Sequence, residues 1–123
     1  MVTIVVVEPD FAIRTLFAEW LFADGYTVRP FGHWVPGHSA LASADVLLVD
    51  LPSPRVPPHF PLAHMHANHA GLVAIGLSSG LSASLGGESA FARSLGLAAV
   101  LAKPCERREL LDAVRHALSR HAA

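Results

Sequence analysis

Five apolar runs of strand length recur along the chain, separated by segments of helical or turn-forming character. They cover residues 2–7, 26–29, 45–49, 72–77 and 97–102. Four of the runs are apolar almost throughout, which is typical of strands buried on both faces of a parallel sheet. The run at 26–29 is more polar, so we expect it at the sheet edge, where Pro30 ends it.

Most of the segments between these runs are predicted to contain helices. Asp10 is the expected N-cap of a first helix, which carries apolar residues at helical spacing: Ile13, Leu16, Phe17, Trp20 and Leu21. A closing helix is expected over 106–120, and shorter helices over 62–70 and 88–95. The stretch 31–43 allows at most two helical turns, and five prolines between 52 and 61 exclude helix there.

Strands that alternate with helices in this way predict an α/β fold. Because crossovers between parallel strands are right-handed, we expect a doubly wound five-stranded parallel sheet of order 2-1-3-4-5 with helices on both faces. Residues 1–123 are expected to form a single domain.

The amino-acid composition narrows the classes of function that we expect for the chain. Apolar residues make up 52% of the chain and charged residues 15%, which suggests that a partner covers part of the surface. A net charge of -1 offers no basic field for nucleic acid. No apolar run reaches membrane-spanning length, and with the lone Cys105 and no leader-like start we expect a cytoplasmic protein that binds neither membrane nor nucleic acid directly.

Polar residues end four of the expected strands. These residues are Glu8, Asp50, Ser78 and Lys103. The carboxyl ends of parallel strands meet at one edge of the sheet, so we expect these side chains to converge there. Two carboxylates suit Mg²⁺, and a lysine with a hydroxyl suits a phosphoryl group.

Over essentially its whole length the chain resembles a response-regulator receiver domain. The matching motifs are Val5-Val6-Val7-Glu8-Pro9-Asp10, Val46-Leu47-Leu48-Val49-Asp50-Leu51-Pro52, Ile75-Gly76-Leu77-Ser78-Ser79 and Leu101-Ala102-Lys103-Pro104. The resemblance implies a non-enzymatic two-component phosphorelay protein. Asp50 is then the phosphoacceptor, Ser78 and Lys103 contact the phosphoryl oxygens, and Pro104 is the family's cis proline.

The resemblance also implies partners and a metal. The phosphoryl donor is a histidine kinase or phosphotransfer protein, and the signal passes to a downstream protein by contact. Mg²⁺ would be held by Asp50 and the carbonyl of Pro52, with Glu8 or Asp10 acting through water. The last strand and helix are the expected homodimer surface, because their exposed charges are of mixed sign.

Three departures from the family pattern matter. Pro9 stands where the family has a second acidic metal ligand, so we expect Mg²⁺ to bind weakly. Val100 replaces the aromatic residue three positions before the lysine, and Arg55 replaces a glycine after the loop proline.

Two other readings of the sequence stay open. A pseudo-receiver that acts as a phosphorylation-independent interaction module is favoured by Pro9. An enzyme on the same fold has less support, since no glycine-rich phosphate loop follows the first strand. The histidines at 59, 64, 66 and 69 are poorly spaced for chelation, so we expect no transition-metal site.

Overall fold

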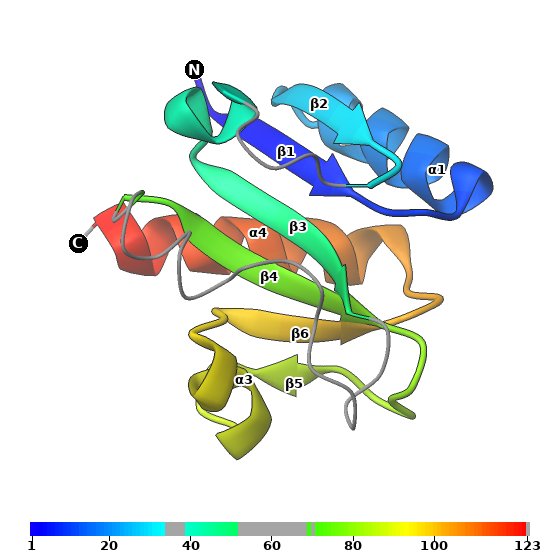
Figure 1. Ribbon diagram of the computed structural model, residues 1–123, viewed down its shortest axis with the longest axis vertical. Helices are drawn as coiled ribbons and strands as arrows, with labels where there is room; N and C mark the ends of the chain where they lie inside the picture. The colour runs from blue at the N-terminus through cyan, green and yellow to red at the C-terminus, as the bar shows by residue number, and fades with distance from the viewer. Residues whose placement is uncertain (34–38, 52–68, 70, 123) are drawn as a thin grey trace.

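The computed structural model describes residues 1–33, 39–51, 69 and 71–122. Its centre is a sheet of order β2-β1-β3-β4-β6-β5 (Figure 1). The strands are β1 (Thr3–Val7), β2 (Thr27–Phe31), β3 (Val46–Leu51), β4 (Val73–Ser78), β5 (Leu85–Gly86) and β6 (Ala99–Ala102). Five of these strands pair in parallel, and their order confirms the predicted 2-1-3-4-5 arrangement.

The sixth strand, β5, was not predicted. Leu85–Gly86 pairs antiparallel with β6, so that Leu85 lies opposite Val100 and Gly86 opposite Ala99. Two residues within a glycine- and serine-rich segment are too few to show the alternating pattern that predicts a strand. The strand covers the edge of β6, and Val100 beneath it is fully buried.

The predicted end of the second strand was wrong. Pro30 lies inside β2, which continues to Phe31. Proline lacks a backbone N–H, but β2 is hydrogen-bonded to β1 alone and forms the edge of the sheet, where a missing donor can face away from the neighbouring strand.

Helices cover both faces of the sheet, as predicted. α1 (Phe11–Ala23) and α4 (Arg107–Ala122) lie behind it in Figure 1. Their apolar residues, among them Phe17, Leu21 and Leu110, pack with one set of strand side chains. The other face is covered by the 3₁₀ turn η1 (Ser39–Ser43) and the helix α3 (Ala90–Leu95).

The ends of the helices follow the sequence closely. Asp10 is the N-cap of α1, as predicted, and its Oδ1 accepts a hydrogen bond from the Ile13 N–H at 3.0 Å. Ser89 caps α3 in the same way, and Gly96 ends that helix in the left-handed conformation with φ of 68°. Polar caps and a glycine thus set where α1 begins and where α3 begins and ends.

The prediction of a helix over 62–70 falls on residues that are outside the described part, except for His69. In the ranges that the structure describes, no helix has the length and apolar character needed to cross a membrane.

Candidate functional site

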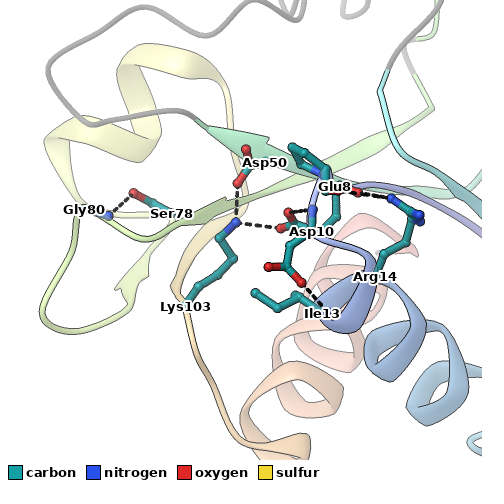
Figure 2. Close-up of polar contacts among 9 residues, drawn as sticks. Glu8, Asp10, Ile13, Arg14, Asp50, Ser78, Gly80 and Lys103 are labelled. Carbon is teal, nitrogen blue, oxygen red and sulfur yellow. Dashed lines mark hydrogen bonds and ion pairs between the residues drawn. The ribbon is translucent and has the colours of Figure 1, made fainter.

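Three of the four predicted strand-end residues meet at the carboxyl edge of the sheet. Val7 lies opposite Val49 in the parallel register, so Glu8 and Asp50 follow at the same level on neighbouring strands. Lys103 follows β6, two strands beyond β3. Its side chain reaches back across the end of β4 to both acids, as Figure 2 shows.

The Lys103 ammonium group bridges the two carboxylates. Its Nζ lies 2.6 Å from Glu8 Oε1 and 2.5 Å from Asp50 Oδ1. Glu8 is only 1% exposed, whereas the Asp50 side chain keeps 19% of its surface in solvent. Asp50 is therefore the acid that a reactant from solvent can reach, and Glu8 is a buried anchor for the lysine.

The two ion pairs set the protonation of Lys103. Burial lowers the pKa of this amine, but the hydrogen bonds and charges of Asp50 and Glu8 outweigh burial, and the pKa stands above its ordinary value of 10.5. The ammonium form is therefore held at neutral pH, where it offsets part of the negative charge of the two carboxylates.

The loop between β1 and α1 is fixed by two sets of contacts. Glu8 Oε2 accepts a hydrogen bond from the Asp10 backbone N–H at 2.9 Å. The Arg14 guanidinium, one turn into α1, donates to the carbonyl of Glu8 at 2.8 Å and to that of Pro9 at 3.4 Å. This role of Arg14 was not predicted from the sequence. The one available indication is its position, because an arginine in the first turns of the helix that follows the acidic loop can reach back to that loop.

Ser78 lies at the end of β4, between β3 and β6, and is fully buried. Its Oγ accepts a hydrogen bond from the Gly80 N–H at 3.1 Å and is turned away from the Lys103 ammonium in Figure 2. The hydroxyl thus shares the edge with Asp50 but caps its own turn. Contact with a ligand beside Asp50 would require it to rotate.

The acidic side chains do not form a Mg²⁺ site as they are arranged. Both Glu8 oxygens are occupied, and the Asp10 carboxylate is engaged as the cap of α1. Pro9 offers no ligand, and the predicted carbonyl of Pro52 is outside the described residues. Within the described ranges, no group of three His, Cys, Asp or Glu side chains could hold a metal ion.

Two smaller predictions can be placed. The peptide bond between Lys103 and Pro104 is cis, as expected from the resemblance. Burial raises the pKa of the Cys105 thiol to about 11, with Glu109 adding to the shift, so this cysteine is not an activated nucleophile.

Comparison with known proteins supports the fold independently. No protein-family model matches the chain, and no curated protein matches it. Solved structures do. A CheY-like response regulator receiver domain protein from Methanospirillum hungatei is 24% identical with a TM-score of 0.77, and the match covers 99% of this chain and 97% of that one.

Two further structures give the same result. A chemotaxis protein from Vibrio cholerae is 19% identical with a TM-score of 0.73, over 95% of this chain and 98% of the other. A response regulator from Thermotoga maritima is 16% identical with a TM-score of 0.74, over 97% and 98%. The chain therefore has the CheY-like fold of response-regulator receiver domains.

Proposed function

We propose that this chain is the receiver of a two-component phosphorelay and that Asp50 accepts a phosphoryl group from a phosphohistidine of a kinase or phosphotransfer protein. The observation that carries the proposal is the Lys103 ammonium, 2.5 Å from a partly exposed Asp50 carboxylate at the carboxyl edge of a receiver fold. One fold can host many functions, so the proposal is supported by this local chemistry together with the fold.

The reaction is a transfer between two nucleophiles. A carboxylate oxygen of Asp50 forms a bond to phosphorus while the bond from phosphorus to the histidine nitrogen breaks. The electron pair of the broken bond stays on the imidazole, and the product on Asp50 is an acyl phosphate. Lys103 would pair with the phosphoryl oxygens, and the Ser78 hydroxyl would leave Gly80 to contact one of them.

Glu8 has a supporting part in this proposal. As a buried carboxylate 2.6 Å from the Lys103 Nζ, it keeps the ammonium at the site when the charge on Asp50 changes. Mg²⁺ at this edge would need Asp50 together with Glu8 or Asp10 through water, and we propose that it binds weakly.

A second candidate function is a pseudo-receiver that acts by protein contact without phosphate. The feature that favours it is Pro9, which has no ligating side chain at the position where the family has a second acidic metal ligand. The two functions differ in whether Asp50 can take up a phosphoryl group.

We propose that residues 1–123 act as one receiver domain in the cytoplasm, passing the signal to a downstream protein. The surface of β6 and α4 stays a prediction for self-association. Two of its charges are already paired: Arg115 donates to both oxygens of Asp24, at 2.8 and 3.0 Å, and lies 3.8 Å from Asp112.

Labelling by phosphoramidate tests the proposal, because this small molecule carries the same kind of phosphorus–nitrogen bond as a phosphohistidine. We expect a label that hydroxylamine removes, as it removes acyl phosphates, and that Asp50→Asn abolishes. A label that resists hydroxylamine would place the phosphoryl group on a hydroxyl such as Ser78 and contradict the proposal.

A further inference from the structure

The helix α1 is apolar on two sides. One side packs on the sheet, where Phe17 and Leu21 are buried. On the other, Phe11 and Phe22 are 71% and 73% exposed. A helix that is apolar around most of its circumference is normally covered on both sides, and the residues that the structure describes cover only one side of α1.

The two exposed phenylalanines belong to a straight row of four side chains along α1, which we call the seam. Phe11, Thr15, Ala18 and Phe22 recur at intervals of four, three and four, the spacing of a helix that packs lengthwise against another helix. These four residues, with Val28 and Pro30 of β2, line a hollow of about 410 Å³. The two central residues are small, so a second helix axis can approach closely between the phenyl rings.

Two opposite charges flank the seam. Arg14 lies on one side of it and Glu19 on the other, five residues further along α1. Arg14 is held at the Glu8 and Pro9 carbonyls and over the Phe11 ring, 5.4 Å from its centre. Glu19 is exposed, and among the described residues it has no ion pair.

We infer that this face binds the same face of a second copy, with the two α1 helices parallel about a two-fold axis. In a parallel pair of helices, a residue that flanks the seam on one side lies next to a residue of the partner helix five positions later in the sequence, which flanks the seam on the other side. Arg14 of each copy would then pair with Glu19 of the other, twice over. An antiparallel pair would instead bring Arg14 near Arg14 and Glu19 near Glu19, so the charges select the parallel arrangement.

This surface is separate from the predicted one on the last helix. The seam lies on the side of α1 that borders β2, at one edge of the sheet, whereas the predicted surface belongs to α4 and to β6, which lies beyond β3 and β4 (Figure 1). The pairing uses none of the groups that contact Asp50, so it goes beyond the proposed phosphoacceptor function and does not depend on it.

Sedimentation velocity of the full chain at about 100 µM tests the inference, since a symmetric pair is favoured by mass action. We expect a dimer. Phe22→Glu should weaken it about a hundred-fold or more, because a charge replaces a large apolar contact of the seam in both copies. Leu16→Glu is the matched control: Leu16 is 42% exposed on the same helix but off the seam, and the dimer should persist.

A charge exchange tests the arrangement itself. Glu19→Lys and Arg14→Glu should each leave mainly monomer, and mixing the two variants should restore a dimer, because both cross-pairs are then of opposite sign. Circular dichroism shows whether each variant is folded, and Glu19→Lys, at an exposed site, carries the test if Arg14→Glu disturbs its loop.

Three results would overturn the inference: a monomeric wild type at 100 µM, a dimer that Phe22→Glu leaves intact, or a dimer that is lost on Arg108→Glu in α4 instead.

Discussion

Lys103 and Glu8 lie 95 residues apart in the sequence, yet the ammonium of one is 2.6 Å from the carboxylate of the other. Glu8 is almost fully buried, and the Lys103 ammonium is the cation that it contacts. Removing one partner of a buried ion pair leaves an uncompensated charge, which is costly.

Lys103→Met should therefore destabilise the protein by about 3 kcal/mol, because the buried Glu8 carboxylate loses its counter-charge. Urea unfolding at neutral pH measures the change. In the double variant with Glu8→Gln, most of this loss should be recovered. Additive losses in the two single variants would mean that the pair is not coupled.

Cys105 gives a pH dependence with a defined sign. Its folded pKa of about 11 lies above the ordinary 9.0, so the unfolded chain releases the thiol proton first as pH rises. The contribution of this thiol to the free energy of unfolding is fully present below pH 9 and is lost as the pH rises toward 11. We expect a loss of about 1 kcal/mol, because solvent reaches the half-buried thiol and reduces the effect. Cys105→Ala should flatten the stability profile in this window. An unchanged profile would contradict the raised pKa.

Pro9→Asp should tighten Mg²⁺ binding about ten- to a hundred-fold, because a direct anionic ligand is restored next to Glu8 and Asp50. Isothermal titration with Mg²⁺ measures this, and labelling by acetyl phosphate should become faster in parallel. Equal Mg²⁺ affinity in the wild type and the variant would show that Pro9 is not at a ligand position, or that Asp10 already supplies the carboxylate.

Ser78→Ala should slow phosphoryl labelling and cost about 1 kcal/mol in stability, because the buried hydroxyl is the acceptor for the Gly80 N–H. Ser78→Thr keeps the hydroxyl and is the matched control for both effects. If labelling of the alanine and threonine variants proceeds at the wild-type rate, Ser78 has only a capping role.

The sheet order and the convergence of Asp50 with Lys103 could be predicted from sequence, because buried parallel strands have clear apolar runs and their carboxyl ends share an edge. The partner of Glu8 could not. A lysine side chain is long enough to reach either acid, and nothing in the sequence decides that it bridges both.

Other misses have local causes. β5 is too short to carry a pattern, and Pro30 is tolerated only because β2 is an edge strand. The exposed Phe11 and Phe22 of α1 lie outside the apolar spacing that predicts this helix, since periodicity marks the buried side but does not reveal a second seam.

The central claim, that Asp50 is a phosphoacceptor, is tested most directly by intact mass spectrometry after incubation with acetyl phosphate and excess Mg²⁺. We predict a gain of one phosphoryl group in the wild type and none in Asp50→Asn. Asp45→Asn is the matched control, because Asp45 precedes the same strand at the opposite edge, where it accepts a hydrogen bond from the Thr3 N–H at 2.9 Å. It should label like the wild type. A wild-type protein that never gains the phosphoryl mass, even as Pro9→Asp, would contradict the phosphoacceptor account and leave the pseudo-receiver.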